Sequence, residues 1–384
     1  MCNEKRKRIA TKGQAIGDTS QKGATDMQDQ LLLRAYREGD ERGLVELRKA
    51  VYPHRGYGLE HWMGWRRRMY QENPAGAGKI WLAEHESRIV AQRPLILMNL
   101  KIDNEIIRIG QTIDLMTHPG YRRRGVFSKL ERYVLDEAKQ QGICLIIGFP
   151  NKAAHPGHVK SGWLDVATMQ VVFKPLNWVN VLKTRIKNKF VLKLGEISGT
   201  LADKTFYREK RVPTIEGLTI AHVSSFDDRV NELWCTLRGQ YRIMVAKDKN
   251  YLNWRYCTIP GVNYSIYVAE KAGEISGYLV FRCVQMKQIS VGVVFEILAQ
   301  SGDIAQCLVS QTIEHCRRQK VDLIYYSAIA NKAGVNAFRK NGFISVPFIK
   351  GGRFCAYSSA SHISTEFLRV RQNWLVQLGD SDMI

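Results

Sequence analysis

The sequence predicts a mixed α/β protein made of two successive domains. Three observations support this fold class. The chain has 384 residues, enough for two hydrophobic cores of ordinary domain size. Runs of β-branched and apolar residues, typical of strands, alternate with stretches in which apolar residues recur at helical spacing. The same order of stretches then occurs a second time, which indicates that the second domain repeats the first.

The composition narrows the class of protein. Hydrophobic residues make up 45% of the chain, as in soluble globular proteins. No apolar run approaches the roughly 20 residues that span a bilayer, and we expect no secretory signal because the N-terminal residues are polar. The eight cysteines show no Cys-x-x-Cys pair and no metal-ligand spacing. We therefore expect a cytoplasmic protein with free thiols and no metal site.

The net charge of +21 predicts an anionic partner. Nucleic acid, an anionic membrane and an anionic small molecule are all compatible with it. However, the basic residues are spread over the chain rather than gathered in one segment. This distribution is typical of a generally basic surface, and it carries no strong nucleic-acid signal.

Residues 1–28 are predicted to form a disordered basic tail, because they are polar and carry the run Lys5-Arg6-Lys7-Arg8. Such a run can tether nucleic acid or lipid, but a solvated tail is the commoner outcome. The first domain is predicted at 29–176. Its opening elements are a strand at 31–36, a helix at 40–51 capped by Asp40, a helix at 59–70, and a hairpin of strands at 80–84 and 88–97.

The stretch from residue 106 to residue 141 is the most informative part of the chain. β-branched residues predict a strand at 106–117, and His118-Pro119-Gly120 ends it. Apolar residues at every fourth position predict a helix at 126–141. The first turn of a helix has unpaired N–H groups and the positive end of the helix macrodipole, so it attracts anions.

A basic turn lies between this strand and this helix. Arg122, Arg123 and Arg124 add positive charge beside the helix start, and Gly125 lets the backbone approach a ligand closely. A pyrophosphate would fit such a site. The turn lacks the Gly-x-x-x-x-Gly-Lys-Ser/Thr pattern of nucleoside triphosphatases and the Gly-x-Gly-x-x-Gly pattern of dinucleotide-binding folds, so both classes are disfavoured.

The segment from Thr117 to Phe127 resembles the acyl-CoA-binding signature of the GNAT acetyltransferase superfamily. That signature is a β-branched residue, x-Pro, and then Arg/Gln-x-x-Gly-x-Gly/Ala. Arg122 and Gly125 match it, whereas Phe127 departs from the usual Gly or Ala. A second GNAT pattern, Asn-x-x-Ala-x-x-x-Tyr-x-x-x-Gly-Phe, is similar to Asn151, Ala154, His158, Gly162 and Trp163.

This resemblance covers about residues 30–175 and implies the GNAT fold. It also implies transfer of an acyl group from acetyl-CoA, which serves as a co-substrate, without a metal. A backbone N–H near Met116 and Thr117 would polarise the thioester carbonyl. The residues that the resemblance assigns to CoA binding are Met116, Thr117, Arg122, Arg123, Arg124, Gly125, Val126, Phe127, Ser128 and Asn151.

Two residues are candidates for proton transfer. His158 stands where the family often has a tyrosine as general acid, and histidine titrates near neutral pH. Alternatively, His158 caps a helix or is simply exposed. Asp114 is the nearest carboxylate on the strand and a candidate base, but it faces away from Gln111 and Ile113, where related enzymes keep a base, unless a β-bulge intervenes. Alternatively, Asp114 orders the backbone.

Residues 177–214 are predicted to form a basic amphipathic linker. Apolar residues recur at every fourth position among lysines and arginines from Trp178 to Leu194. A stripe of this kind can lie on an anionic membrane, so peripheral membrane contact through 178–194 is one expectation. More often such a stripe packs against its own protein.

The second domain is predicted at 215–362 and repeats the first without its basic turn. Asn331 and Asn151 are 331 − 151 = 180 residues apart, and the hairpin glutamates Glu270 and Glu84 are 270 − 84 = 186 apart. Gln300 to Ala305 replaces the arginines and includes an acidic Asp303. Phe338 stands at the position of His158 and cannot transfer a proton. We therefore expect a degenerate second domain that shapes the acceptor cleft.

The C-terminal tail is predicted at 363–384 and ends in the acidic run Gly379-Asp380-Ser381-Asp382-Met383-Ile384. Some tandem acetyltransferases similar to this chain, such as the enhanced-survival type, return their C-terminus to the active site. Asp380, Asp382 or the terminal carboxylate could act in this way, although a frayed tail is the commoner outcome.

The sequence thus supports two functions of different classes. The first is an acyl-CoA-dependent acyltransferase, an N-acetyltransferase by resemblance, that acts on an amine or hydroxyl of a small molecule or sugar precursor. The second is a catalytically inactive tandem fold that binds nucleic acid or an anionic membrane. The three arginines beside the helix start favour the first function, whereas the loss of both tyrosines leaves the second possible.

Overall fold

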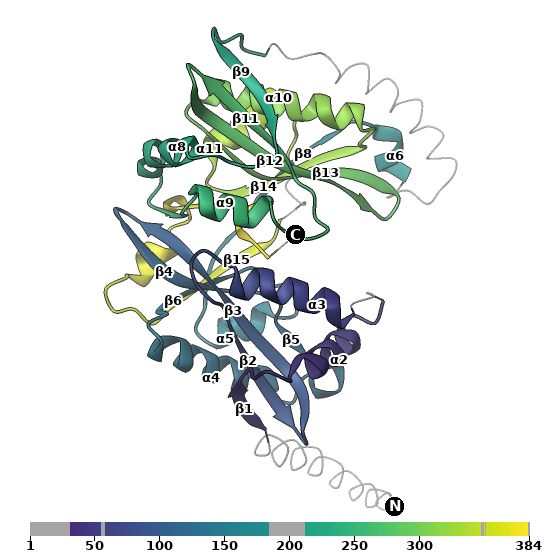
Figure 1. Ribbon diagram of the computed structural model, residues 1–384, viewed down its shortest axis with the longest axis vertical. Coiled ribbons are helices and arrows are strands. Elements are labelled where there is room, and N and C mark those ends of the chain that lie inside the picture. Colours follow the sequence, from purple (N-terminus) through teal and green to yellow (C-terminus); the bar gives the residue numbers. More distant parts are fainter. Residues whose placement is uncertain (1–30, 55–57, 184–211, 347–348, 350, 383–384) are drawn as a thin grey trace, which may run out of the picture. The chain divides into compact units, whose positions relative to one another are not determined.

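The computed structural model describes residues 31–54, 58–183, 212–346, 349 and 351–382 (Figure 1). The predicted basic tail at 1–28 and most of the predicted linker therefore lie outside the described residues. The described chain is a mixed α/β fold, as the sequence predicts. It divides into two compact units: unit 1 is Met1–Trp62, Lys79–Pro94 and Asp114–Glu137, and unit 2 is Met63–Gly78, Leu95–Ile113 and Ala138–Ile384.

Unit 1 contains the segment with the basic turn. Its elements are β1 (Leu32–Ala35), α2 (Glu41–Val51), the start of α3 (Leu59–Arg66), β2 (Lys79–His85), the first part of β3 (Arg88–Ile102), β5 (Met116–Thr117), the 3-10 turn η2 (Pro119–Tyr121) and most of α4 (Val126–Gln140). β1 pairs antiparallel with β2, and β5 pairs antiparallel with β3. Val126, Leu130, Val134 and Ala138 of α4 are all buried, which confirms the apolar face predicted from their spacing.

Unit 2 contains the rest of the described chain. Its elements from the N-terminal side are η1 (Arg67–Gln71), β4 (Glu105–Thr112), β6 (Leu145–Gly148), α5 (His155–Lys160), β7 (Leu164–Thr168), β8 (Gln170–Pro175) and α6 (Trp178–Lys183). Next come β9 (Leu218–Val223), α8 (Arg229–Leu237), η3 (Arg238–Gln240), β10 (Ile243–Val245), α9 (Lys249–Tyr256), β11 (Ser265–Lys271), β12 (Glu274–Met286) and β13 (Ile289–Ala299). The last are α10 (Gly302–Arg318), β14 (Leu323–Ile329), α11 (Lys332–Lys340), β15 (Arg353–Ser358), α12 (Thr365–Arg369), η4 (Arg371–Asn373), β16 (Trp374–Gln377) and η5 (Leu378–Asp380).

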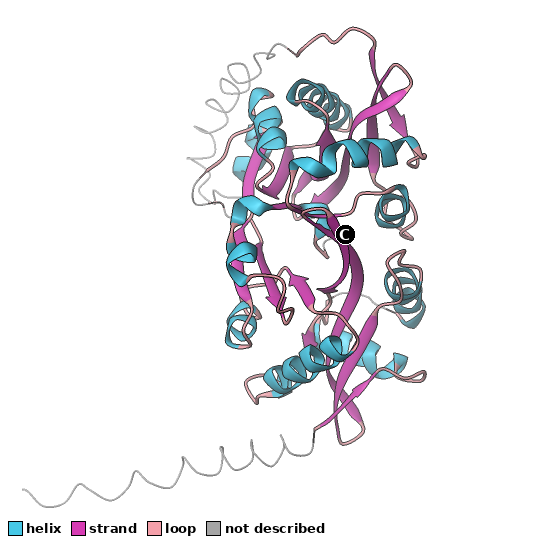
Figure 2. Cartoon of the chain, turned by 90° about the vertical axis from the view of Figure 1, so that its left-hand side faces the viewer, coloured by secondary structure: helices cyan, strands magenta, loops and turns pink. Residues whose placement is uncertain are grey.

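One continuous sheet runs through unit 2. Its strand order is β7-β15-β6-β4-β3-β10-β16-β14-β13-β12-β11-β9, and β8 pairs with β14. Figure 2 draws the strands in magenta and the helices in cyan. The pairs β4–β6, β13–β14 and β10–β16 are parallel. In the C-terminal half, α10 covers the face of the sheet that carries Leu279 and Phe281, and Phe226 packs on Tyr278 of the opposite face. Both faces are thus covered, which explains why these strands are apolar on both sides.

The same order of elements occurs in both halves of the chain. Strand, two helices, hairpin, strand, helix, strand and helix run from β1 to α5, and again from β9 to α11, where β10 is an addition. Below, the N-terminal half means residues 32–175 and the C-terminal half means residues 218–382. The order of the elements agrees with the repeat that the sequence predicts, and the tandem arrangement of two domains stays a prediction.

The two halves exchange strands, which the sequence reading did not anticipate. β8 is predicted as part of the first domain, but it pairs antiparallel with β14 of the C-terminal half. In return, β15 of the C-terminal half lies between β6 and β7 of the N-terminal half. Ile344 also bridges to Phe173 of β8, so each exchanged strand has neighbours on both sides. Hydrogen bonds between the halves therefore replace pairs that a simple repeat would make within each half.

Three local expectations are wrong. Asp40 precedes α2 but does not cap it with its side chain, because its backbone is helical, with φ −75° and ψ −10°, and its carboxylate binds Arg34 instead. The sequence of residues 226–244 has a helical pattern and predicts one helix, but α8 ends at Leu237, and Met244 lies in β10, where β3 and β16 supply strand partners. The tail is not frayed in its described part, because α12, β16 and η5 order it as far as Asp380.

Candidate active site

A β-bulge interrupts the long strand that the sequence predicts before the basic turn. The last pair of β4 with β3 is Thr112–Leu95, and the first pair of β5 with β3 is Met116–Gln92. Three residues of this segment therefore stand opposite two residues of β3. Asp114, in the middle of the three, has a left-handed backbone with φ 51°. The bulge changes the strand parity at Asp114, which is the condition under which the sequence reading allowed it to act as a base.

The Asp114 side chain is held by two neighbours. Its carboxylate forms an ion pair with Arg48 of α2. Gln92 Nε2 donates to Asp114 Oδ2 at 3.1 Å and to the Asp114 main-chain oxygen at 2.8 Å. Burial raises the pKa of the Asp114 carboxyl, although Arg48 and Gln92 act in the opposite direction. These contacts order the bulge, and the role of Asp114 as a base stays a prediction.

Residues 118–125, called the arginine loop below, join β5 to α4. The loop opens with His118, whose Nδ1 accepts a hydrogen bond from the backbone N–H of Gly120 at 3.1 Å and so starts η2. Arg122 Nε donates to the carbonyl oxygen of Thr117 at 3.2 Å. Arg123 and Gly125 then adopt left-handed φ angles of 61° and 77°, which turn the chain into α4. Glycine suits the second position because it carries no Cβ that would oppose this conformation.

Positive charge gathers where the arginine loop meets α4. The side chains of Arg122, Arg123 and Arg124 are exposed, and the first turn of α4 contains no acidic residue. The N-terminal end of the helix carries the positive end of its macrodipole. Helix dipole, backbone N–H groups and guanidinium groups together make this turn suited to an anion such as a pyrophosphate.

The remaining predicted CoA-binding residues of unit 1 differ in exposure. Met116 and Val126 are buried, so only their backbone atoms could meet a ligand. Thr117, Phe127 and Ser128 are partly exposed. Under the loop, Arg93 Nε and Glu131 Oε2 form a fully buried ion pair at 2.7 Å that joins β3 to α4. This pair fixes the helix whose first turn forms the site.

Asn151 and His158 belong to unit 2. Asn151 Oδ1 accepts hydrogen bonds from the backbone N–H groups of Ala153 and Ala154, both at 3.0 Å, and so forms a turn before α5. His158 on α5 is 2% exposed, and its ring lies 4.6 Å from the ring of Trp163. The structure therefore excludes an exposed His158. Contact of Asn151 with CoA and proton transfer by His158 stay predictions.

Comparison with known proteins identifies the N-terminal half. The family model of the acetyltransferase (GNAT) domain matches residues 33–163. Residues 33–163 belong to the GNAT superfamily. The match contains β1 to α5, and hence both the bulge and the arginine loop. The acyltransferase family expected from the two motifs is therefore confirmed.

Solved structures of proteins described as acyltransferases share the fold of more than this segment. The chain is similar to a GCN5-related N-acetyltransferase from Anabaena variabilis, with 12% identity, 85% of this chain and 72% of that chain covered, and a TM-score of 0.61. A probable N-acyltransferase from Enterococcus faecalis gives the same values. Saccharomyces cerevisiae N-myristoyltransferase with bound myristoyl-CoA matches at 12% identity over 92% of this chain and 82% of that chain, with a TM-score of 0.54. No curated protein matches the sequence.

The C-terminal tail passes beside the central strand of the GNAT domain. Gln111 on β4 donates from Nε2 to the backbone carbonyl of Asp380 at 2.7 Å. Gln111 stands where the sequence reading placed the base of related enzymes. Arg255 holds the next turn of the tail, because its Nε and one terminal nitrogen donate to the carbonyl oxygens of Gly379 and Ser381, each at 2.9 Å. The tail is therefore anchored at the level of β4.

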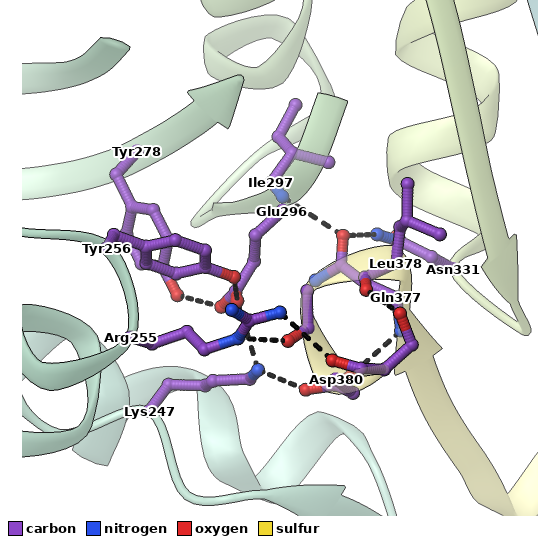
Figure 3. A network of polar contacts seen from close by, with 12 residues as sticks. Lys247, Arg255, Tyr256, Tyr278, Glu296, Ile297, Asn331, Gln377, Leu378 and Asp380 are labelled. Carbon is purple, nitrogen blue, oxygen red and sulfur yellow. Dashed lines mark hydrogen bonds and ion pairs between the residues drawn. The ribbon is translucent and has the colours of Figure 1, made fainter. Parts of the chain in front are cut away.

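A buried charge cluster holds the tail in place through Asp380 (Figure 3). Lys247 forms ion pairs with Asp380 and, at 3.0 Å, with Glu296 of β13. Tyr256 and Tyr278 donate their hydroxyl hydrogens to the Glu296 carboxylate. Burial disfavours the Lys247 ammonium, but Asp380 and Glu296 outweigh it and raise the Lys247 pKa, so this lysine stays charged. Each buried charge in the cluster thus has an opposite partner.

The tail also fills the part of the C-terminal half that corresponds to the bulge. β13 pairs with β14 only as far as Val294, and then the two strands part. Gln377 enters the gap: its Oε1 accepts from the backbone N–H of Ile297 at 3.0 Å (Figure 3). The same oxygen accepts from the hydroxyl of Tyr326 at 2.8 Å. Ser301 caps α10 by accepting from the backbone N–H of Ile304. Two backbone donors at this position, the N–H groups of Ile297 and Ile304, are therefore bonded to side chains of the chain itself.

A second polar cluster lies on the exchanged strand β15. His155, Asp165 and Cys355 each offer one possible metal-ligand atom, and these atoms lie within 4.8 Å of one another. Such a set of nitrogen, oxygen and sulfur ligands could hold a metal ion. However, Arg353 already binds Asp165 at 2.7 Å, and His155 Nε2 lies 3.0 Å from the same carboxylate. Burial raises the pKa of the Cys355 thiol to about 12. The Asp165 carboxylate of this group is thus already paired with the positive charge of Arg353.

A small polar cavity of about 130 Å³ lies in unit 2 between the segment before β2 and the start of α9. Its lining residues are Pro74, Ala75, Asn99, Ala246, Asp248, Asn250 and Tyr251. The Tyr251 side chain is 7% exposed, and its hydroxyl has no hydrogen-bond partner among the described residues. Its ring lies 4.9 Å from Lys247 Nζ, which links the cavity to the buried charge cluster.

The sequence reading missed the buried ions although the sequence contains a signal for them. Glu296 interrupts an otherwise apolar strand sequence, and Arg93 lies in a strand sequence where Gln92 is the only other polar residue between Ile89 and Met98. A charge at such a position is buried, and a buried charge requires a partner. The identity of the partners, Glu131 and Lys247, follows only from the three-dimensional contacts.

Proposed function

We propose that the chain is an acetyl-CoA-dependent acyltransferase that transfers the acyl group to an amine or hydroxyl of a small molecule or sugar precursor. The arginine loop carries this proposal, because its three exposed arginines adjoin a helix start without acidic residues. The GNAT match over 33–163 supports acyl transfer as the reaction class. Acetyl-CoA as donor and N-acetylation rather than O-acetylation belong to the proposal.

The residues of the arginine loop suit the anionic part of CoA. Arg122, Arg123 and Arg124 would bind the phosphate oxygens, and the backbone from Gly125 to Ser128 would donate hydrogen bonds to the pyrophosphate. When bound, CoA supplies an activated thioester. The backbone N–H groups near Met116 would stabilise the developing oxyanion on its carbonyl.

Proton transfer is assigned to two residues in this proposal. His158 would give a proton to the leaving thiolate, since an imidazolium can do so near neutral pH. Asp114 would accept the proton of the attacking group, which its raised pKa favours and its ion pair with Arg48 opposes. The hydrogen bond from Gln111 to Asp380 supports a further assignment, in which the tail end contributes to the acceptor side.

The polar cavity beside Tyr251 is the candidate for an acceptor subsite. Its size of about 130 Å³ fits one polar group of a small molecule rather than a whole macromolecule. Amide, carboxylate and phenol groups line it, and such groups recognise amines and hydroxyls by hydrogen bonds. The unpartnered Tyr251 hydroxyl supports this assignment, because buried hydroxyls normally have a partner.

The deciding experiment is isothermal titration of acetyl-CoA into the purified chain, with the double variant Arg124→Glu, Gly125→Glu beside it. We expect one micromolar site per chain in the wild type and at least a hundredfold weaker binding in the variant, because two carboxylates repel the phosphates. Gly302→Glu at the matching start of α10 is the control, and it should leave binding unchanged. Equal binding by wild type and the double variant would place CoA elsewhere.

The absence of binding at millimolar acetyl-CoA would overturn the acyltransferase proposal. In that case the binding of nucleic acid and of anionic vesicles should be measured at several salt concentrations, because the net charge of +21 suits both. Membrane contact through 178–194 stays a prediction, since residues 184–194 lie outside the described residues. No helix in the described ranges is long and apolar enough to cross a bilayer. The free thiols of the described cysteines support the proposed cytoplasmic location.

A further inference from the structure

Two cysteines of unit 2 lie together at a position where glycine leaves room for them. Cys283 on β12 pairs across the strands with Gly292 on β13. A Cβ atom added to Gly292 would stand 2.8 Å from the Sγ atom of Cys316 on α10. The Cys316 sulfur therefore occupies the space above the strand pair to which Cys283 belongs.

The direction of the side chains places the two thiols on the same face of the sheet. Alternate residues of a strand point to the same side, so Cys283 shares a face with Leu279 and Phe281. Leu279 and Phe281 lie in the hydrophobic core that also contains Cys316. Cys283 continues this face beyond the core and is exposed, whereas Cys316 is fully buried. One thiol is thus open to solvent, and the other lies directly behind it.

The two thiols also influence each other's ionisation. A hydrogen bond with Cys316 lowers the pKa of the Cys283 thiol, whereas Cys283 and burial raise the pKa of Cys316. Thiolates react with oxidants and thiols do not, so Cys283 is the more reactive of the two. Redox-sensitive cysteines are typically exposed, of low pKa, and adjacent to a second cysteine that can complete a disulfide.

We propose that Cys283 and Cys316 form a peroxide-sensitive thiol pair that closes reversibly into a disulfide. The Cys283 thiolate attacks one oxygen of a hydroperoxide, the O–O bond breaks, and Cys283 becomes a sulfenic acid while water or an alcohol leaves. The Cys316 sulfur then attacks the Cys283 sulfur, the S–O bond breaks, and the hydroxyl departs as water with the Cys316 proton. The two thiols are oxidised by two electrons in all, the peroxide is reduced, and a dithiol restores the pair.

The disulfide would join α10 to β12 covalently. It closes the segment from residue 283 to residue 316, which restricts the unfolded chain and so favours the folded state. We therefore expect oxidation to raise the melting temperature of the chain by several degrees. Neither cysteine belongs to the GNAT domain at 33–163, so this site is independent of the proposed acyl transfer.

The test treats the full chain with hydrogen peroxide, blocks the remaining thiols, and maps the non-reduced peptides by mass spectrometry. We expect a peptide pair linked through Cys283 and Cys316 that has lost two hydrogen atoms and separates on addition of dithiothreitol. Dimedone, which traps sulfenic acids, should label Cys283 weakly in the wild type and at least tenfold more strongly in Cys316→Ala. The melting temperature should rise on oxidation in the wild type and stay unchanged in Cys283→Ser.

Cys235 on α8 is the matched control, because it is exposed like Cys283 and the proposal gives it no partner cysteine. Its dimedone labelling should be the same in the wild type and in Cys316→Ala. If Cys316→Ala is unstable, Cys283→Ser still tests the proposal, because it changes only an exposed residue. Failure to find the linked peptide, while Cys283 is over-oxidised to a sulfinic acid, would overturn the proposal.

Discussion

The two halves of the chain differ at one shared position of the fold, where a strand ends and the next helix begins. In the N-terminal half the strand breaks at a bulge, and three exposed arginines stand beside the start of α4. In the C-terminal half the corresponding backbone N–H of Ile297 is bonded to Gln377, and Ser301 caps α10. Asp303 adds a negative charge to the first turn of α10.

The difference shows that a helix start binds an anion only where the chain leaves it accessible. Every helix has unpaired N–H groups in its first turn. In the C-terminal half a serine caps one of them, an acid opposes the positive end of the dipole, and a glutamine from the tail bonds the neighbouring strand, so fewer donors are left for a ligand. The C-terminal half therefore keeps the architecture of the N-terminal half, while its equivalent of the arginine loop is closed by its own residues.

The largest effect in this comparison should come from the cluster that holds the closing tail. Lys247→Met removes the cation between Glu296 and Asp380 and leaves two buried carboxylates without it. We expect the free energy of unfolding to fall by about 3–5 kcal/mol, as measured by urea denaturation. Arg242→Ala, which removes an exposed ion pair with Asp103, is the control and should produce no measurable change. A small effect of Lys247→Met would mean that the carboxylates are protonated in the folded chain.

The second prediction concerns the proposed acid, His158. Replacing it with phenylalanine gives the N-terminal half the residue type that the C-terminal half has at this position, Phe338. His158 lies 4.6 Å from Trp163, and Phe338 lies 4.8 Å from Phe343, so a phenyl ring has a precedent at this position. His158→Phe removes the proposed proton donor. It should lower kcat for acetyl transfer by about a hundredfold and leave the affinity for acetyl-CoA unchanged. An unchanged kcat would show that His158 is a core residue only.

The third prediction concerns the glutamine that closes the C-terminal half. Gln377→Leu leaves the backbone N–H of Ile297 and the hydroxyl of Tyr326 without their acceptor. We expect the free energy of unfolding to fall by about 1–3 kcal/mol. Hydrogen exchange of the Ile297 amide should also become faster. If that amide stays protected as in the wild type, a different group closes the gap between β13 and β14.

The smallest effect should come from the partly exposed ion pairs of the hairpin glutamates, because each half has one. The hairpin residue Glu84 binds Arg34, and its counterpart Glu270 binds Arg229. Burial alone would raise the pKa of Asp40, but hydrogen bonds from Arg34 and from the Arg37 backbone outweigh it and lower the pKa below its usual value.

A lowered carboxyl pKa stabilises the folded state above the unfolded pKa of about 4 and loses this effect as the pH falls through the folded pKa. Asp40→Asn should therefore cost about 1 kcal/mol or less at pH 7, and the difference from wild type should shrink below about pH 4. Urea denaturation at a series of pH values measures it. A difference that stays constant to pH 3 would show that the ion pair with Arg34 is not its source.

The sequence predicts those parts of the molecule that depend on neighbouring residues. The helix α4, its buried face, the hairpins of both halves and the arginine loop follow from local spacing and turn residues. The GNAT resemblance adds the family, which the match at 33–163 confirms. The bulge at Asp114 could be named only as a condition, because strand register depends on the partner strand.

The features that local patterns could not predict depend on distant partners. β15 fits between β6 and β7 because its residues pair with theirs, and no periodicity distinguishes this from pairing within its own half. Likewise, the run from Gly379 to Asp382 is polar and predicts a frayed tail. Asp380 is nevertheless 2% exposed, because Lys247 and Gln111 bind it. Isolated charges inside apolar strands, such as Glu296, were the only local indication of this cluster.

The exchange of β8 and β15 has a consequence for the order in which the protein can be made. Gly148 of β6 pairs with Cys355 of β15, and the two are 355 − 148 = 207 residues apart. A ribosome must therefore synthesise residues 149–355 before the strands of the N-terminal half can acquire the strand next to β6. Contacts between such distant residues slow folding and leave strand edges exposed in the meantime. A nascent chain arrested before β15 should consequently bind chaperones that recognise unpaired strands, and either half produced alone should aggregate unless the other is supplied.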